Sequence, residues 1–418
     1  MSRAQFETTP DVMNAKLERF AYGFRKVGQD PDKILLARPV EEPKALSQLF
    51  KFCDIIVEKY SGHIRKSQYS INESKRHPEI YSILFDCLYN EFFVQGAKSP
   101  PLNFTVDDLS SFIHTKQGAG SDKFEEIALG MYTGALLHLL TISNMREKKR
   151  TIVHLSDVDM NCLFYCARRA GTVILENCKG NHVLKYAGAR TGTIGKIVVN
   201  NFTGSQLAES AGSNEGRIGM LILNNIISES MPPALRTLSA LREDGAVANN
   251  FCYTEGKAGL FIARNIKCRT FAHDIASRNG SMNMVVADSV ITNLSNNYRL
   301  KYTPNSYDVD GDIEPPYFML SSYLEEKQGF NLVVVNNVSS YALNPVERSA
   351  KWVDSCDNNL VDRVGNPEEY ARVVKKFKIN KMLGLVDNLA GKTTEEQTRM
   401  IDQIYAIYKA NAARERWK

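Results

Sequence analysis

Several features of exported or membrane-bound proteins are missing from this chain of 418 residues. Its eight cysteines are scattered rather than grouped, which indicates reduced thiols, because disulfide frameworks are typical of short secreted domains. The N-terminus lacks an apolar stretch of signal-peptide length, and the longest apolar run, residues 127–142, is too short to cross a membrane. We therefore expect a cytoplasmic protein without a membrane partner.

A large excess of one charge is also missing. The 52 basic and 47 acidic residues give a net charge of +5, which does not by itself indicate nucleic-acid binding. Basic runs occur at 146–150, 375–381 and 414–418, but no RNP, KH, zinc-finger or helix-turn-helix spacing accompanies them. A nucleic-acid-associated factor is therefore only an alternative, and its binding should fall steeply with added salt.

The sequence contains a repeated phrase, in which an apolar triplet is followed by a turn residue and a further apolar residue. The turn residues lie 24, 24, 40, 24 and 48 positions apart: Asn177, Asn201, Asn225, Asn265, Ser289 and Asn337. One short β-branched strand per fixed period predicts a parallel β-helix, a solenoid with repeats of about 24 residues. We expect the stacked amides of Asn177, Asn201, Asn225, Asn265 and Asn337 to form a hydrogen-bonded ladder.

The strands of this repeat are apolar on both faces. Alternate side chains of a strand point to opposite faces, so Val173 and Leu175 face the interior and Ile174 faces outward, yet every equivalent outward residue is aliphatic. A strand that is apolar on both sides is normally covered on both. We expect the chain's own helices to provide the cover, with a partner or a second copy as the alternative.

Helical periodicity characterises both ends of the chain. Pro367 is followed by acidic residues, and residues 394–397 fit a capping box, so both positions predict helix starts. The expected fold is therefore mixed α and β in three parts: a helical domain at 1–150, a parallel β-helix at 151–345 and a C-terminal helical segment at 346–418.

One group of residues resembles a zinc finger in its spacing. Cys162, Cys166, Cys178 and His182 follow the pattern C-x3-C-x11-C-x3-H. However, Cys178 occupies a repeat position that other repeats fill with phenylalanine, isoleucine or valine. We interpret it as a small buried hydrophobe rather than a metal ligand.

A second group consists of alternating carboxylates. Asp308, Asp310 and Asp312 lie in the acidic run 308–314, which has a glycine at its centre and can converge on Ca²⁺ or Mg²⁺. The match to an EF-hand loop is poor, and a solvated acidic turn is the simpler interpretation. No other cofactor is expected.

Catalytic motifs are scarce, since neither Gly-x-Ser-x-Gly nor a Walker A loop occurs. The predicted architecture resembles that of pectate lyases, polygalacturonases and phage tailspikes, which implies a carbohydrate-active enzyme, of lyase or glycoside hydrolase type, as one alternative. Its candidate catalytic residues are Asp274, Asp288 and Asp308.

A non-enzymatic function is the preferred hypothesis. A β-helix with helical ends also resembles, in layout, the scaffold proteins of the SUF iron–sulfur assembly system, which implies a function in assembly. We therefore expect a scaffold or interaction protein that binds a protein partner or a second copy through the β-helix wall and the helical ends.

Overall fold

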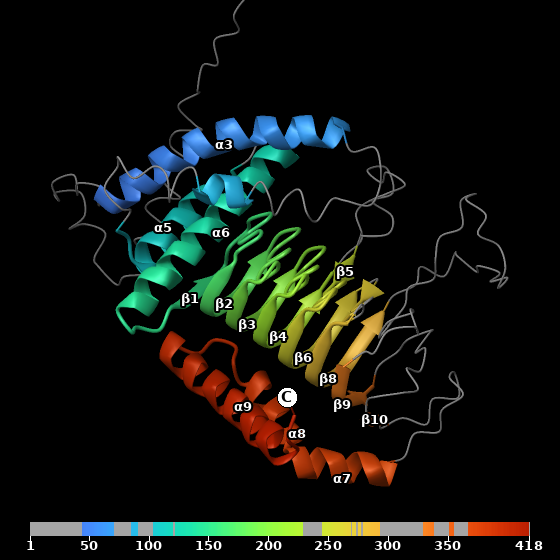
Figure 1. Cartoon of the computed structure of the whole chain (residues 1–418). Coiled ribbons are helices and arrows are strands. Elements are labelled where there is room, and N and C mark those ends of the chain that lie inside the picture. Colours follow the sequence, from blue (N-terminus) through green and yellow to red (C-terminus); the bar gives the residue numbers. More distant parts are fainter. Residues whose placement is uncertain are drawn as a thin grey trace, which may run out of the picture.

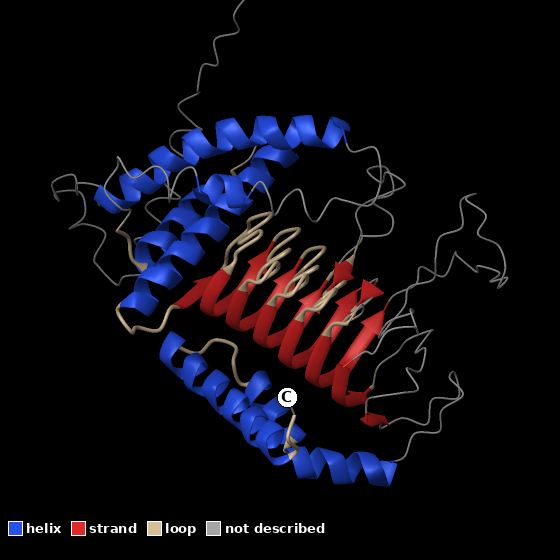
Figure 2. Ribbon diagram, in the orientation of Figure 1, coloured by secondary structure: helices blue, strands red, loops and turns tan. Residues whose placement is uncertain are grey.

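A computed structural model describes the fold. It covers residues 44–70, 85–90, 103–119, 122–228, 245–268, 270–272, 275–276, 279–292, 329–337, 351–354 and 367–417. One long parallel sheet lies between two groups of helices (Figure 1). The helices before the sheet in sequence lie at its β1 and β2 end, and those after it lie along its opposite side (Figure 2).

The first group contains α3 (Lys44–Ser70), α5 (Val106–Lys116) and α6 (Lys123–Arg146). Helix α6 begins at Asp122, whose carboxylate accepts hydrogen bonds from two backbone N–H groups of the first turn. Among the described residues α6 is the helix with the length and composition of a membrane span, but 78% of its apolar stretch is buried inside the protein. An apolar helix buried in this way is typical of a protein core.

The sheet contains eight strands in the order β1-β2-β3-β4-β6-β8-β9-β10, and all of its pairs are parallel. The strands are β1 (Ile152–Ser156), β2 (Arg169–Lys179), β3 (Thr193–Thr203), β4 (Arg217–Ile227), β6 (Lys257–Cys268), β8 (Ser281–Thr292), β9 (Gly329–Asn336) and β10 (Lys351–Asp354). Their register follows the sequence repeat: Val173 is paired with Ile197, and Ile197 with Leu221. Strand β10 extends the sheet past residue 345, and the predicted division into three parts stays a prediction.

The predicted parallel β-helix is wrong. The described strands form a single open sheet flanked by helices, and the segments that connect them are runs of turns. Outside the sheet, the two-residue strands β5 (Ala246–Val247) and β7 (Thr270–Phe271) pair with each other, and Leu207 forms an isolated parallel bridge with Val247. The architectural resemblance to polysaccharide-cutting enzymes and to the SUF scaffold proteins therefore loses its basis.

The backbone of the connecting segments explains this difference. Every second residue there has a left-handed φ, for example 59° at His182, 59° at Leu184 and 58° at Tyr186. A strand requires extended backbone at each residue, so this alternation excludes one. The segments still hydrogen-bond from one repeat to the next, as between Tyr186 N–H and the Glu209 carbonyl at 2.9 Å.

The second apolar face of the sheet is covered by the C-terminal helices α7 (Pro367–Phe377), α8 (Ile379–Asp387) and α9 (Thr394–Arg414). The outward-facing aliphatic residues are each at most 2% exposed: Ile174, Val198, Ile222, Ile262, Val286 and Val334. They pack with buried residues of these helices such as Phe377, Met382 and Ile404. The chain's own helices therefore supply the cover for this face.

A column of glycines lets α9 approach the sheet closely. A Cβ atom at Gly259 would lie 2.8 Å from the hydroxyl oxygen of Tyr408, and one at Gly219 would lie 3.3 Å from that of Tyr405. One repeat further on, Asn283 donates from its side-chain amide to the Tyr408 hydroxyl at 2.8 Å. The glycines thus fix the path of α9 across the strands.

Candidate functional site

The ladder asparagines lie where each strand turns sharply. The six turn residues have φ between 50° and 57°, in the left-handed region that asparagine tolerates better than most residues: Asn177, Asn201, Asn225, Asn265, Ser289 and Asn337. The next residue points back into the core, as shown by Cys178, which is 1% exposed. Backbone conformation therefore explains why asparagine recurs at this position.

Hydrogen bonds join four of these asparagines into a continuous ladder. The side-chain amide of Asn201 donates to Asn177 Oδ1, that of Asn225 to Asn201 Oδ1, and that of Asn265 to Asn225 Oδ1, each at 3.0 Å. Ser289 instead donates to the neighbouring Asp288 carboxylate at 3.4 Å. Asn337 has the same backbone conformation one strand further on.

A second column lies beside the ladder, at the ends of the strands. Its residues are in register and all exposed: Lys179, Thr203, Ile227, Lys267 and Ile291. Ile227 is 43% exposed and Ile291 is 50% exposed. We call this column together with Asn177, Asn201, Asn225 and Asn265 the ladder strip. Because neighbouring strands are about 4.8 Å apart, the strip presents regularly spaced side chains on a rigid backbone.

The candidate catalytic residue Asp288 belongs to a different, buried column under the C-terminal helices. The residues that precede the turn positions form this column: Glu176, Asn200, Asn224, Arg264, Asp288 and Asn336. Asp288 is 6% exposed and accepts a hydrogen bond of 2.7 Å from Asn336. Arg264 Nε lies 3.5 Å from Asp288 and 2.9 Å from Asp387 of α8. The Asp288 carboxylate is therefore engaged inside the protein.

The other carboxylates proposed from the sequence as catalytic or metal-binding residues lie outside the described part of the chain. Asp274, Asp308, Asp310 and Asp312 are among them, together with the acidic run 308–314. The structure therefore describes no contact between these aspartates and Asp288.

The cysteine and histidine group is described; its three cysteines are buried and His182 is half-buried. Burial raises the pKa of the Cys166 thiol to about 12 and that of Cys178 to about 11. Burial also holds the pKa of His182 well below its usual value. Metal binding requires thiolates, which these surroundings disfavour. Over the described ranges no group of three or more histidine, cysteine or carboxylate side chains has the geometry of a metal site.

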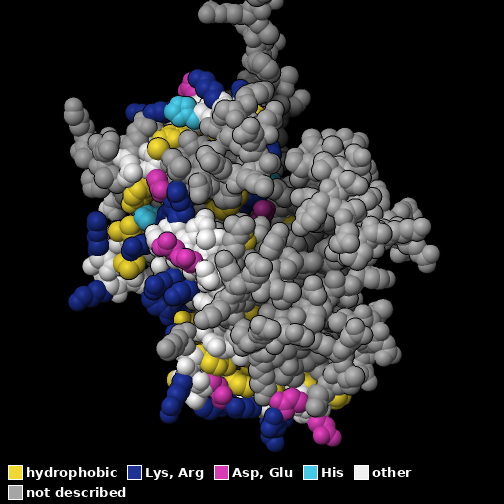
Figure 3. Space-filling model, turned by 45° about the vertical axis from the view of Figure 1, so that its right-hand side comes forward, with side chains coloured by type: hydrophobic (Ala, Val, Ile, Leu, Met, Phe, Trp, Pro, Cys, Tyr) yellow, Lys and Arg dark blue, Asp and Glu magenta, His cyan; other side chains and the backbone are white. Residues whose placement is uncertain are grey.

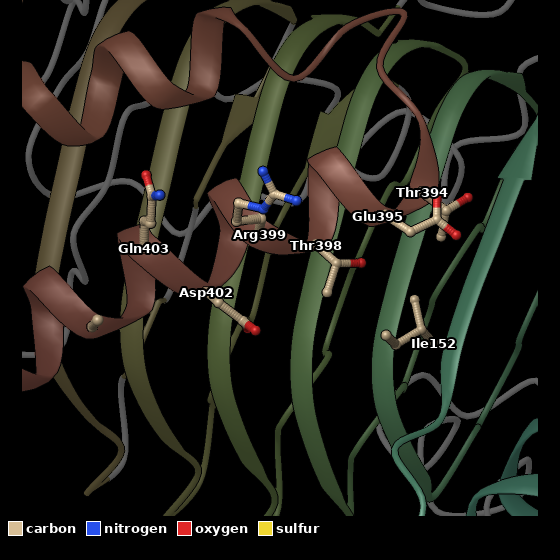
Figure 4. Close-up of a pocket in the computed structure, with 8 residues that line it drawn as sticks. Ile152, Thr394, Glu395, Thr398, Arg399, Asp402 and Gln403 are labelled. Atoms are coloured by element: carbon tan, nitrogen blue, oxygen red, sulfur yellow. The ribbon is translucent and has the colours of Figure 1, made fainter.

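A groove runs along the N-terminal half of α9, beside the outer face of β1 (Figure 4). Its volume is about 570 Å³, and it is lined by Ile152, Thr394, Glu395, Thr398, Arg399, Asp402, Gln403 and Ala406. Asp402 also accepts two hydrogen bonds from Arg150, at 2.8 and 3.0 Å, and contacts Lys196. The hydrogen bonds from Arg150 are the main cause that lowers the Asp402 pKa to about 2. This ion cluster fixes the middle of α9 over the sheet.

A polar cluster lies where the groove meets the start of α9. His154 Nδ1 is 2.8 Å from the Thr394 hydroxyl oxygen, and His154 Nε2 is 3.4 Å from Glu176 Oε2. The Glu176 carboxylate accepts from the Gly391 N–H at 2.7 Å and from the Gln397 amide at 2.9 Å. This cluster could not be predicted from the sequence, because the strand register and the packing of a distant helix are both needed to bring the three side chains together.

On the face that Figure 3 shows, charges of both signs are mixed among the described residues. In the view of Figure 3, Lys and Arg side chains lie beside Asp and Glu side chains on the described surface. This mixture differs from the single-sign field expected for a phosphate-backbone interface.

Comparison of the chain with protein-family models, with curated proteins and with solved structures finds no match.

Proposed function

We propose that this protein is an interaction protein of scaffold type, which self-associates through the ladder strip. The observation that carries the proposal is the exposure of Ile227 and Ile291 in one column. The apolar faces of the sheet are covered by the chain's own helices and turns. We therefore place the assembly surface on the exposed ladder strip and not on a face of the sheet. The two isoleucines lie two strands apart on a rigid backbone, with Lys267 between them, and an exposed apolar patch is typical of an interaction site.

The order of side chains along the strip favours a second copy as the partner. A two-fold axis brings the same patch of both copies together. If the axis passes at Ile227, then Ile227 meets its own copy, Thr203 meets Lys267, and Lys179 meets Ile291. Neither lysine faces a lysine in this arrangement, and the apolar stem of Lys179 packs on an isoleucine. The strip is therefore self-complementary.

The experiment is light scattering of the purified chain over a range of concentrations. The unaltered protein should have twice the monomer mass of 47.0 kDa at high concentration. Ile227→Asp places two carboxylates opposite each other across the axis and should give a monomer. The matched control is Met145→Asp, which changes an exposed methionine on α6, outside the strip. A monomer at every concentration of the unaltered chain would reject self-association.

The proposed location is the cytoplasm. The seven described cysteines are free thiols, and six of them are buried, which suits a reducing compartment. The carbohydrate-active alternative gains no support from Asp288, whose carboxylate is engaged with Arg264 and Asn336.

A further inference from the structure

The cluster at the start of α9 contains a hydroxyl, an imidazole and a carboxylate in sequence. Thr394 Oγ1 lies 2.8 Å from His154 Nδ1, and the opposite ring nitrogen faces Glu176 at 3.4 Å. His154 and Glu176 project from neighbouring strands on the same sheet face, and their side chains are 15% and 7% exposed. An imidazole between a hydroxyl and a carboxylate is the arrangement that activates nucleophiles in acyl-transfer enzymes.

The surroundings keep the carboxylate and the imidazole in place. Glu176 accepts hydrogen bonds from Gly391 N–H and from Gln397, which is 1% exposed. This orients its second oxygen, Oε2, towards Gln397 and His154 together. His154 Nε2 is buried and makes no hydrogen bond in this structure, and Glu176 Oε2 lies 3.4 Å from it. Catalytic contacts of this kind commonly shorten when substrate binds. The carboxylate thereby favours the tautomer that leaves Nδ1 free to accept the Thr394 proton.

The nucleophile candidate faces an accessible space. Thr394 is half-buried and lines the groove, where Ile152 of β1 lies close to it (Figure 4). Thr394 and Glu395 are the first two residues of α9, and the N–H groups of a first helical turn have no carbonyl partner within the helix. The Glu396 N–H of this turn already donates to the Thr393 hydroxyl oxygen at 3.3 Å. The N–H groups of Thr394 and Glu395, with the positive end of the helix dipole, can stabilise negative charge on a carbonyl oxygen.

We propose that Thr394, His154 and Glu176 form a site that hydrolyses carboxylic esters with a short acyl chain. Thr394 Oγ attacks the carbonyl carbon while its proton moves to His154 Nδ1, and the bond to the leaving alkoxide breaks as His154 returns the proton to it. Water then attacks the acyl-threonine, His154 takes its proton, and the carboxylic acid leaves as Thr394 Oγ regains a proton. The reaction is redox-neutral and needs no co-reactant besides water.

This activity is independent of self-association, because the ladder strip lies at the carboxyl ends of the strands and shares no residue with the groove. We expect a small ester, because the groove has a volume of about 570 Å³ and Thr394 is half-buried. The side chain of Ile152 provides an apolar contact for the acyl chain, whereas Arg399 and Gln403 lie further along the groove (Figure 4).

The test uses the full chain and p-nitrophenyl acetate as the probe, with release of p-nitrophenol followed by absorbance. Thr394→Val keeps the shape but removes the hydroxyl, so turnover should fall by a factor of about 100 or more. His154→Asn should cause a loss of similar size. Thr115→Val is the matched control, since Thr115 is exposed on α5 and does not line the groove. This variant should keep the rate within a factor of about two.

A second readout separates catalysis from folding. Mass spectrometry of protein quenched during turnover should locate an acetyl group on Thr394, and Thr394→Ser, which keeps a hydroxyl, should still be acylated. Circular dichroism verifies that each variant is folded. No turnover by the unaltered chain, an unchanged rate in folded Thr394→Val, or acetyl found only on lysines would each overturn the proposal.

Discussion

At the scale of single residues, the repeat depends on side chains that tolerate unusual backbone. Asn225 has a φ of 55°, and its amide group both donates to Asn201 and accepts from Asn265. Asparagine therefore satisfies the sharp turn and the neighbouring strands at once. The connecting segments place Leu184 and Tyr186 in the same backbone region, so their burial and inter-repeat hydrogen bonds must compensate for the strain.

Replacing one ladder residue should therefore lower stability in two ways. Asn225→Ala loses two amide hydrogen bonds and puts a less suitable residue at a positive φ, so we expect a loss of about 1–3 kcal/mol. Urea denaturation followed by circular dichroism measures it. Asn225→Gly also removes the amide hydrogen bonds but tolerates the positive φ, so it should be more stable than Asn225→Ala. Thr203→Ala, on the exposed neighbouring column, is the control, and equal midpoints for it and Asn225→Ala would contradict the role of the ladder.

At the scale of elements, helix α6 carries a buried histidine. His138 is 9% exposed and packs edge-on against Tyr89, with ring centroids 4.7 Å apart. Burial lowers the pKa of His138 to about 4, and the positive charges of Arg169 and Arg168 add to the effect. The fold therefore favours the neutral imidazole.

Lowering the pH should destabilise the folded protein, because His138 binds a proton more readily in the unfolded chain than in the folded one. The folded pKa is lower than the unfolded pKa of about 6.5, so this contribution is complete above pH 6.5 and is lost as the pH falls towards 4. The loss is of the order of 2–3 kcal/mol for a shift of this size. Urea midpoints between pH 7.5 and 4.5 should therefore fall more steeply for the unaltered chain than for His138→Gln. Parallel curves for the two proteins would refute the linkage.

At the scale of the whole molecule, the C-terminal helices complete a layered structure. They bury the aliphatic columns on the second face of the sheet, and the glycine column and the Asp402 ion cluster hold α9 against it. A sheet face of this size exposed to water would promote aggregation. The helices are therefore part of the folding unit rather than a separate tail.

Removing these helices should expose that face. A chain that ends at residue 366 should bind the dye ANS strongly and aggregate, because residues such as Ile222 and Ile262 lose their cover. Fluorescence and light scattering check this. Adding a peptide of residues 367–418 in excess should reduce the dye signal, and a truncated chain that stays monodisperse and dye-free would show that the cover is dispensable.

The repeat and its register could be predicted from the sequence because they depend on local spacing. Intervals of 24 residues between asparagines identified which strands stack and which side chains share a column. Strands that are apolar on both faces likewise indicated a sheet covered on both sides, because the alternating direction of side chains follows from backbone geometry alone. The sequence also predicted a helix start near residue 394, but the capping box joins Thr393 and Glu396, one residue before the predicted pair 394 and 397.

Tertiary structure alone decided the shape of the repeat and the candidate catalytic site. Nothing in the local sequence around Leu184 or Tyr186 indicates left-handed backbone, so the sequence alone predicts a β-helix. Packing and hydrogen bonds between repeats instead hold the connecting segments as turns. His154, Glu176 and Thr394 meet because α9 returns to the first strands after more than two hundred residues. Contacts between residues so distant in sequence arise from packing of whole elements, which spacing along the chain does not encode.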